Sequence, residues 1–467
     1  MYRSDTIAAI ATGMGKSAIG MVRVSGPEAI VLCDGIFTGK KRIKDMDTYT
    51  AAYGKITDGA EVLDEAVVLV MKGPHTFTTE DTVEIDVHGG PFVMKRIMEL
   101  LIRRGARVAE PGEFTKRAYL GGRIDMSEAE AVMDVINAET DMALKSSVNQ
   151  LSGRLSSEIV ELRERILYNT AYIESALDDP ENYSLEGFSE KLESDVEELR
   201  ARIKSLIQTA DEGRIIKEGI STAIIGSPNA GKSSILNMLL GEDRAIVTDV
   251  EGTTRDTLEE YISLDGIVLR LIDTAGIRET RDIVEKIGVD KARELITEAD
   301  LLLIVVDGSR ELTENDRSIL SLETDKKTII LLNKNDKEQL VDRSDIESLY
   351  GDEKAEGDKR QCPGIVNISA ISGEGADALR DEIKDLFFKG ELDYNNQLRI
   401  TNTRHKQSLI LADESLEKVQ ESIAQDVGED FLTIDLMSAY EYLGEIIGET
   451  LEDDLADKIF SEFCMGK

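Results

Sequence analysis

The sequence predicts a multidomain protein in which an α/β domain accompanies an α+β domain and a helical domain. Its 467 residues exceed the length that one hydrophobic core normally supports, so about three domains are expected. The apolar pattern also changes along the chain, from short β runs to helical stripes and then to strands that alternate with helices. The length therefore predicts several domains, and the changing apolar pattern predicts that they belong to different fold classes.

Composition narrows the class of protein. Hydrophobic residues make up 41% and charged residues 31%, which is typical of a globular chain. No apolar run approaches the roughly 20 residues that span a bilayer, and the opening MYRSDTIAAIATG lacks the basic and apolar regions of a secretion signal. We therefore expect a cytoplasmic protein without a membrane segment. The widely spaced Cys33, Cys362 and Cys464 suggest neither a disulfide framework nor a zinc site.

The chain is strongly acidic. Lys and Arg total 55 against 92 Asp and Glu, which gives a formal net charge of −37. Such a surface repels phosphate backbones on average, so a nucleic-acid partner would need local contacts or a second protein to hold it. A solvated, highly soluble surface, adapted for instance to a salty cytoplasm, is the simpler explanation of the charge.

Residues 1–120 are expected to form the α+β domain. The segments AIGMVRVSG, DEAVVLVMKGP and DTVEIDVHGGP are rich in β formers and end in Gly or Pro. One helix interrupts them in FVMKRIMELLIRRG, where Val93, Ile97 and Leu101 recur at helical spacing.

Residues 121–219 and 390–467 are expected to form one helical domain in two parts. Ser127 followed by Glu130 has the spacing of a capping box at the start of the first helix. The apolar stripes of these helices need a partner, so the last helices should pack against those before Gly219. The intervening stretch then becomes an inserted domain.

Residues 220–389 alternate apolar strands with helical segments, the pattern of a doubly wound, mainly parallel sheet. The expected strands lie in STAIIG, IVLRLID, LLLIVVD, TIILLN and GIVNIS. In such a sheet the ligand lies at the carboxyl ends of the strands, and the polar motifs of this region occur there.

The first motif, GSPNAGKS at Gly226–Ser233, is a phosphate-binding loop between a strand and a helix. Its backbone N–H groups wrap the β-phosphate, Lys232 balances the β and γ charges, and the Ser233 hydroxyl reaches Mg²⁺. Asn229 inside the loop can help hold a K⁺ ion, which would neutralise charge where no arginine is available to do so.

The next two motifs surround the γ-phosphate. In DTAG, Asp273 can hold Mg²⁺ through water, and the Gly276 amide can sense the γ-phosphate. GTTRD supplies Thr254 as a second hydroxyl for the metal, ordered only when the γ-phosphate is present. Ile277 stands where small GTPases place a water-orienting glutamine, so another residue must orient the water.

The motif NKND, beginning at Asn333, predicts that the base is guanine. The Asp336 carboxylate accepts from both donors on the Watson–Crick edge of guanine, whereas adenine would leave it unpaired, a mismatch that rejects an analogue about 10⁴-fold. Lys334 would cover the ring, and the pair Ser369 and Ala370 would place an amide near the guanine oxygen. The four motifs lie in order on one α/β pattern and predict a GTP-binding domain.

These motifs, together with TIAAIAT, GMVRVSGP, PGEFTKRAYLGGRIDMSEAEAV and the terminal FCMGK, resemble the tRNA modification GTPases of the MnmE (TrmE) family over essentially the whole length. The resemblance implies an N-terminal tetrahydrofolate-binding domain that also makes a homodimer, and a Ras-like G domain inserted into the helical domain. Met465 stands where the family usually has isoleucine, a change of similar apolar volume.

The resemblance also implies roles for single residues. Glu285 would orient the hydrolytic water, and Ser233 with Thr254 would bind Mg²⁺. The K⁺ ligands would be Asn229, Thr248, Val250 and Thr253, and the folate contacts Arg23, Glu80, Arg123 and Lys467. The full set of expected GTP contacts is Asn229, Ala230, Gly231, Lys232, Ser233, Ser234, Thr248, Thr254, Asp273, Thr274, Ala275, Gly276, Asn333, Lys334, Asp336, Ser369 and Ala370.

The implied function is that of the GTP-hydrolysing subunit in a heterotetramer with a separate FAD-dependent, MnmG-type protein. The complex would form 5-aminomethyl- or 5-carboxymethylaminomethyl-uridine at the wobble position of tRNA, with the one-carbon unit taken from 5-formyl- or methylene-tetrahydrofolate. A basic partner would hold most of the tRNA, and K⁺-stimulated GTP hydrolysis would drive a conformational change.

The segment EFCMGK places Cys464 three residues before Lys467. As a prenylation box, CMGK has glycine and lysine where no common rule accepts them, and no basic stretch precedes it. Under the resemblance, a tail that reaches the N-terminal domain would bring Cys464 beside the folate as a nucleophile or acid/base. A structural plug is the alternative.

Two other classes of GTPase stay open at this level. A ribosome-assembly or RNA-binding GTPase switch would carry a basic accessory module, which this sequence does not display. A self-assembling GTPase of the septin or dynamin type would leave the folate-like domain and the tail unexplained.

Overall fold

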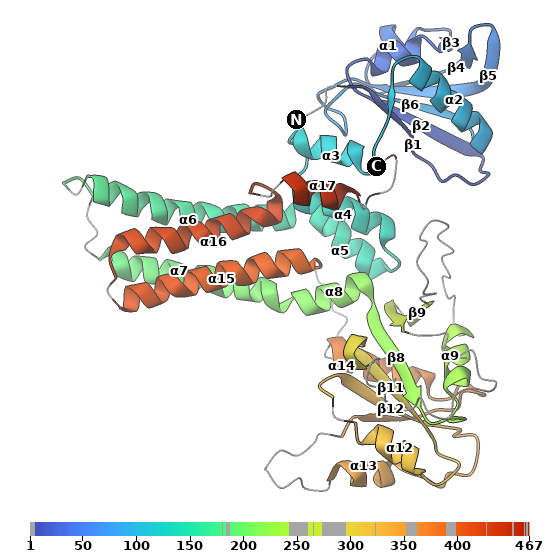
Figure 1. Cartoon of the computed structure of the whole chain (residues 1–467), viewed down its shortest axis with the longest axis vertical. Helices are drawn as coiled ribbons and strands as arrows, with labels where there is room; N and C mark the ends of the chain where they lie inside the picture. The colour runs from blue at the N-terminus through green and yellow to red at the C-terminus, as the bar shows by residue number, and fades with distance from the viewer. Residues whose placement is uncertain are drawn as a thin grey trace. The chain divides into compact units, whose positions relative to one another are not determined.

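The computed structural model describes the residues 5–179, 181–183, 187–241, 260–264, 266–272, 296–322, 324–351, 362–388, 398–425, 427–450, 453–461, 463 and 466 (Figure 1). The chain divides into two compact units. The first consists of Met1–Asn137, Ser147–Ser205 and Arg404–Lys467, and the second of Ala138–Ser146 and Leu206–Thr403.

The first unit begins with a seven-stranded sheet in the order β3-β4-β5-β6-β2-β1-β7. Neighbouring strands are antiparallel, except that β1 and β7 are parallel. The strands are β1 (Ile7–Ile10), β2 (Ile19–Ser25), β3 (Phe37–Gly39), β4 (Thr50–Asp58), β5 (Glu61–Met71), β6 (Thr82–His88) and β7 (Arg107–Val108).

Helices cover one face of this sheet. Their apolar residues share a core with the strands, among them Ile97 of α2 (Pro91–Arg103) and Cys33 of α1 (Ala29–Asp34). The sequence led us to expect only α2; α1, α3 (Glu113–Leu120) and the 3-10 turn η1 (Ile43–Asp45) are additional. In α1 the run AIVLCD is rich in residues that also favour strands, so its local preference is ambiguous.

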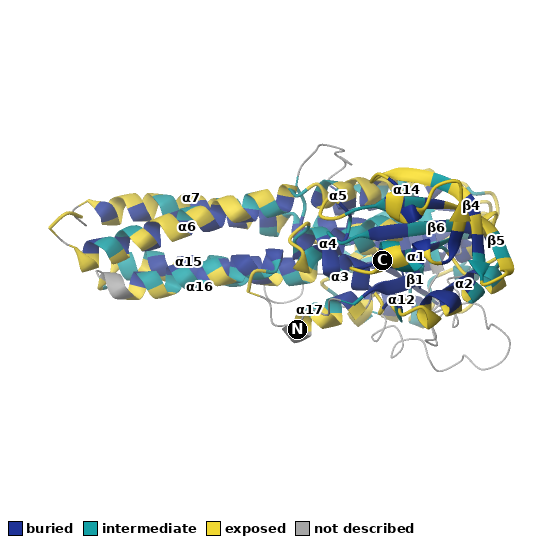
Figure 2. Ribbon diagram, turned by 90° about the horizontal axis from the view of Figure 1, so that it is seen from above, coloured by how far each residue is buried: buried dark blue, intermediate teal, exposed yellow. Residues whose placement is uncertain are grey.

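The other described elements of the first unit are helices. They are α4 (Met126–Asn137), α6 (Arg154–Asp178), α7 (Phe188–Gln208), α15 (Thr403–Ala424), α16 (Glu429–Ile447) and α17 (Asp453–Ser461). In Figure 2 the buried residues of α6, α7, α15 and α16 lie on the sides that face one another. Arg163 of α6 donates to the carbonyl of Tyr440 on α16 at 3.2 Å, and Arg200 of α7 pairs with Asp413 on α15 at 2.8 Å. Helices that lie about 200 or more residues apart in the sequence, α6 and α7 on one side and α15 and α16 on the other, thus pack together.

The expected capping box at Ser127 and Glu130 is wrong. The box is made by Asp125 and Glu128, each of which accepts from the other's backbone N–H at 2.9 Å, and Ser127 lies inside α4. Glu130 instead enters the core, where it lies 3.0 Å from the guanidinium of Arg404 and 2.7 Å from His405. Both Asp and Ser suit an N-cap, so the spacing alone could not choose between two overlapping boxes.

The second unit contains a six-stranded sheet in the order β13-β12-β11-β8-β10-β9. All pairs are parallel except β9 with β10. The five expected strands are confirmed as β8 (Ile220–Gly226), β10 (Ile267–Leu271), β11 (Leu301–Asp307), β12 (Lys327–Asn333) and β13 (Gly364–Asn367). The additional strand is β9 (Glu260–Leu264), which forms a hairpin with β10.

Helices pack on both faces of the second sheet, which makes it doubly wound as expected. On one face α9 (Lys232–Gly241) and α14 (Ala376–Phe388) share a core with Leu303 and Leu331. On the other, α12 (Glu314–Leu320) and α13 (Arg343–Gly351) pack against Ile304 and Ile330. Adjacent strand residues point to opposite faces, so these apolar strands serve two cores at once.

The remaining described helices are α5 (Asp141–Leu151) and α8 (Ala210–Glu218), which directly precedes β8. Arg214 of α8 pairs with Asp300 at 2.7 Å, just before β11. Among the helices that the structure describes, none has both the length and the apolar character needed to cross a membrane.

Candidate functional site

The phosphate loop joins the end of β8 to the start of α9. Gly231 in this loop has φ +103°, and a Cβ atom there would lie 2.1 Å from the side-chain nitrogen of Asn333. Only glycine therefore lets the loop approach Asn333 this closely. Asn229 also has a positive φ of +62°, and its side chain is exposed at the loop surface.

The ammonium group of Lys232 points into the phosphate loop. Its Nζ donates to the carbonyls of Gly226 at 2.7 Å and Ser227 at 3.0 Å. Burial lowers the pKa of Lys232, and the negative charge of Asp316 opposes that shift. The ammonium group is thus held inside the loop, as recognition of phosphate requires.

Asn333 ties three segments of the nucleotide site together. Its side chain is buried; Nδ2 donates to the Ala230 carbonyl at 2.9 Å, and Oδ1 accepts from the Ala370 amide at 3.2 Å. The carboxyl ends of β12 and β13 are thereby joined to the phosphate loop.

Asp336 is exposed and ready to accept hydrogen bonds. The Ser369 hydroxyl donates to its Oδ1 at 2.7 Å, and this bond lowers the pKa of Asp336. An ionised carboxylate that retains free lone pairs is the acceptor that the two donors of guanine require.

The structure brings the described part of the expected GTP site to the carboxyl ends of β8, β12 and β13. That part consists of Asn229, Ala230, Gly231, Lys232, Ser233, Ser234, Asn333, Lys334, Asp336, Ser369 and Ala370. The other residues expected there lie outside the described residues, namely Thr248, Val250, Thr253, Thr254, Asp273, Thr274, Ala275, Gly276, Ile277 and Glu285.

Polar residues at the end of β11 and just after it also contact this site, although none of the sequence motifs includes them. The side-chain amide of Asn315 donates to Ser227 Oγ in the phosphate loop at 2.9 Å, and Lys334 Nζ lies 2.5 Å from Asp307 Oδ2. Two signals were present: an aspartate at the end of a predicted strand, and T-x-x-D at Thr313 and Asp316 just after it.

The candidate folate residues lie in the first unit. Arg23 on β2 donates to Glu84 at 2.9 Å, and Ser25, two residues further on, donates to Glu80 at 3.0 Å. Glu80 also accepts from Arg117 at 2.9 Å. Arg117 was not singled out from the sequence; it is only 3% exposed and has the carboxylates of Asp5, Glu80 and Glu113 around it.

One apolar cluster brings the two candidate arginines near each other. Phe77 and Phe114 belong to this cluster, and the Arg23 guanidinium lies 5.6 Å from the ring centre of Phe114. Arg123 lies 5.5 Å from that of Phe77 and donates to the Thr76 carbonyl. Two cations beside an aromatic cluster suit an anionic ligand that carries a flat ring.

The C-terminal segment reaches the same region. The Gly466 carbonyl accepts from Arg23 NH1 at 3.0 Å, and Phe463 is buried in a cluster with Phe460 and Met126. Gly466 has φ +88°, and a Cβ there would lie 2.7 Å from the Ile10 carbonyl oxygen. Cys464 and Lys467 themselves lie outside the described residues.

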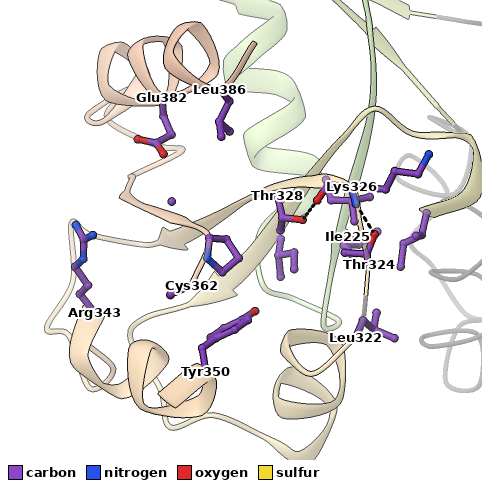
Figure 3. A pocket seen from close by; sticks show the side chains of 15 residues that line it. Ile225, Leu322, Thr324, Lys326, Thr328, Arg343, Tyr350, Cys362, Glu382 and Leu386 are labelled. Atoms are coloured by element: carbon purple, nitrogen blue, oxygen red, sulfur yellow. Dashed lines mark hydrogen bonds between the residues drawn. The ribbon is translucent and has the colours of Figure 1, made fainter. Parts of the chain in front are cut away.

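The side chains drawn in Figure 3 line a cavity in the second unit. Its volume is about 560 Å³. Its lining includes Leu302, Thr328 and Gly364, near the starts of β11, β12 and β13, whereas the nucleotide motifs follow the ends of strands. Burial raises the pKa of the Cys362 thiol in this lining, so the thiol is a weak nucleophile at neutral pH. We assign no chemistry to this cavity.

A phosphate loop, a guanine-selective motif and a doubly wound sheet define a GTP-binding protein of the P-loop class. Family models of the MnmE helical domain and of the N-terminus of the GTP-binding protein TrmE match residues 126–464 and 6–123. The chain therefore belongs to the MnmE family of tRNA modification GTPases.

Two relatives matched over their full length agree with this assignment. A protein of Lachnoclostridium phytofermentans named tRNA modification GTPase MnmE is 50% identical over 468 residues, with 100% of both chains covered. One of the same name from Clostridioides difficile is 45% identical, again with 100% of both chains covered. The G domain of the T. maritima FeoB iron transporter is 24% identical over 36% of this chain and 97% of its own, with a TM-score of 0.25.

Proposed function

We propose that this GTPase forms 5-aminomethyl- or 5-carboxymethylaminomethyl-uridine at the tRNA wobble position, in the cytoplasm, with a one-carbon unit from tetrahydrofolate. The main support for the proposed folate site is the hydrogen bond that Arg23 donates to the Gly466 carbonyl. It supports a site in which the N-terminal sheet and the C-terminal segment act together, because both supply residues to one place.

The residues proposed to hold the folate are Arg23, Glu80, Arg123 and Lys467. The arginines would pair with folate carboxylates, and Glu80, which Arg117 and Ser25 already orient, would accept from ring N–H groups. Bound 5-formyl- or methylene-tetrahydrofolate would supply the one-carbon unit. Cys464 is proposed as the nucleophile or acid/base beside it.

In the nucleotide site, GTP would contact the motif residues and Glu285 would orient the attacking water. Ser233 and Thr254 are the proposed Mg²⁺ ligands, and Asn229, Thr248, Val250 and Thr253 those of K⁺. The exposed side chain of Asn229 supports this, because its amide oxygen is a suitable ligand for a cation. The two ions would balance phosphate charge as hydrolysis proceeds and drives a conformational change.

A homodimer is proposed to form through the N-terminal sheet. Ile19, Tyr53 and Val67 are 61%, 64% and 42% exposed on strands whose alternate residues face the helix-covered core. Clusters of large apolar side chains on an open sheet face are typical of interfaces. Val67→Glu should therefore shift the mass measured by light scattering toward the monomer; Val62→Glu, also on β5 and 51% exposed at its start, is the matched control.

The proposed complex is a heterotetramer with an FAD-dependent, MnmG-type subunit that binds most of the tRNA. The charge of −37 supports this division, because an acidic surface attracts tRNA poorly. The domains proposed for this chain are 1–120 for folate and dimerisation, 121–219 and 390–467 for the helical domain, and 220–389 for the inserted G domain.

Mass spectrometry of tRNA wobble uridines tests the proposed reaction. Cells that lack this chain should lose the aminomethyl-type groups, and the wild-type gene should restore them. Cys464→Ser should keep GTP hydrolysis and fail to restore them. Full modification without the chain would contradict the proposed function, whereas full modification by Cys464→Ser would remove only the role of Cys464.

A further inference from the structure

A closed ring of polar groups connects the phosphate loop with the guanine motif through the segment after β11. Its members alternate between anions or acceptors and cations or donors. We call this set the clamp ring; it consists of Ser227, Asn315 with its neighbour Asp316, Arg310, Asp307, Lys334 and the backbone carbonyl of Asn229.

The first part of the clamp ring joins the phosphate loop to the N-terminal turn of α12. Ser227, the second residue of that loop, is 3% exposed, and its hydroxyl accepts from the side-chain amide of Asn315 at 2.9 Å. Asn315 is the neighbour of Asp316 in the first turn of α12. Asp316 is fixed in turn, because it forms the capping box of α12 with Thr313. The capped N-terminal end of α12 therefore fixes the position of Ser227 in the phosphate loop.

The second part of the ring leads to the base motif. Arg310 donates to Asp316 Oδ2 at 2.8 Å, and its Nε lies 3.6 Å from Asp307 Oδ2. The same Asp307 oxygen lies 2.5 Å from Lys334 Nζ, which also donates to the Asn229 carbonyl at 3.2 Å. The ring thus returns to the phosphate loop two residues after it started.

The charges explain why the ring should act as a whole. Burial raises the pKa of both Asp307 and Asp316, but their hydrogen bonds outweigh it, chiefly those from Lys334 to Asp307 and from Arg310 to Asp316, and lower both pKa values. Both carboxylates are therefore ionised at neutral pH. Loss of Arg310 would remove a cation from the buried carboxylates of Asp307 and Asp316, close to the phosphate loop. A buried charge that loses its partner is strongly destabilising.

We propose that Arg310 is a positioning residue that makes the phosphate loop and the guanine motif hold and release the nucleotide as one unit. Arg310 acts on Ser227 through Asp316 and the adjacent Asn315, and it acts on Lys334 through Asp307. The sequence motifs assign it no role, since it lies outside all four of them.

A double-mutant cycle on GDP release tests this coupling. The full-length protein is loaded with fluorescently labelled GDP, and the release rate is measured by stopped flow for Ser227→Ala, Arg310→Gln and the double variant. Each single variant removes one hydrogen-bonded link of the clamp ring, so release should quicken about tenfold. Since both variants open the same ring, the double variant should also release GDP only about tenfold faster than the wild type.

The alternative outcomes are distinct. Release about a hundredfold faster in the double variant would mean independent effects and would overturn the proposal, as would an unchanged rate for Arg310→Gln. A purely structural role of Arg310 would lower the melting temperature without any coupling to Ser227. Arg317→Gln, at an exposed arginine on α12, is the matched control and should leave release unchanged.

A second variant at Arg310 keeps the proposal testable if Arg310→Gln does not fold. Should Arg310→Gln unfold at the assay temperature, the cycle is repeated with Arg310→Lys. A lysine keeps the charge but cannot contact both carboxylates as a guanidinium does. It should therefore still quicken release, to a smaller extent than the tenfold above, and still couple to Ser227→Ala; multiplicative effects would again overturn the proposal.

Discussion

The nucleotide site and the candidate folate site are built in opposite ways. The nucleotide site uses short contiguous motifs at the ends of neighbouring parallel strands, such as Gly226–Ser233 and the four residues from Asn333. The candidate folate site joins residues that are far apart, and its clearest contact links Arg23 with Gly466, 443 positions away. One site follows from local backbone geometry and the other from tertiary packing.

This difference between the two sites explains why one could be recognised in the sequence and the other could not. Phosphate is recognised by backbone N–H groups, so a loop of fixed length with glycines at set positions is required and leaves a pattern. A site made of single side chains from several elements leaves only isolated charges, which resemble a solvated surface. The following experiments test whether the two sites also behave as separate units.

The largest effect is expected for Lys232→Ala. Removal of the ammonium group from the phosphate loop should lower kcat/KM for GTP hydrolysis about a thousandfold, because a preorganised charge at the phosphates is lost. Binding of reduced folate, measured by calorimetry, should stay within about twofold of the wild type. Lys418→Ala, an exposed lysine on α15, is the control for both assays. Parallel loss of both activities would contradict the separation of the sites.

Acid should weaken the first unit through Glu130. Burial raises the pKa of Glu130, but His405 and Arg404 outweigh it and lower the pKa to about 2. Since this value lies below the unfolded value near 4.5, the stabilisation is fully present above pH 4.5 and is lost as the pH falls toward 2.

Urea unfolding measures this contribution. Glu130→Gln should lower the free energy of unfolding by about 3 kcal/mol at pH 6, and the difference from the wild type should shrink steadily below pH 4.5. Glu414→Gln, an exposed residue on α15, should show no such trend. A difference that stays constant with pH would mean that the ion pairs of Glu130 are not its source.

Exchange of K⁺ for Na⁺ tests the proposed cation in the nucleotide site. At equal ionic strength, GTP turnover in NaCl should be about a hundredfold slower than in KCl, the size of effect expected when one charge-stabilising group is lost. Asn229→Ala should reduce the difference between the two salts. Equal rates in both salts for the wild type would remove the K⁺ site from the proposal.

The smallest effect is expected for the C-terminal contact. Gly466→Ala adds a Cβ 2.7 Å from the Ile10 carbonyl oxygen at a φ of +88°, which costs roughly 1–2 kcal/mol. The affinity for reduced folate should fall about tenfold while GTP hydrolysis is unaffected. Gly428→Ala, where the added atom meets nothing within 4 Å, is the matched control. Equal folate affinities would separate the C-terminal contact from the folate site.

The sequence predicted those features that local geometry determines. The five parallel strands, the phosphate loop and the order of the motifs followed from apolar runs and glycine spacing. The capping box at Ser127 was misplaced, because Asp125 offers the same chemistry two residues earlier. Arg117 was missed, because only tertiary packing brings Glu80 to it. The partners of Arg310 lie within six residues of it, but Arg310 belongs to none of the nucleotide motifs and so it was not singled out.

The contact between Arg23 and Gly466 also sets an order of events during synthesis. A ribosome that adds about 5–20 residues per second reaches Gly466 some 20 to 90 s after Arg23. The strands β1 to β7 and their helices lie wholly within the first 108 residues, so this sheet can fold while the rest of the chain is still being made. The nascent protein therefore acquires its folded N-terminal sheet well before the segment that completes the candidate folate site exists.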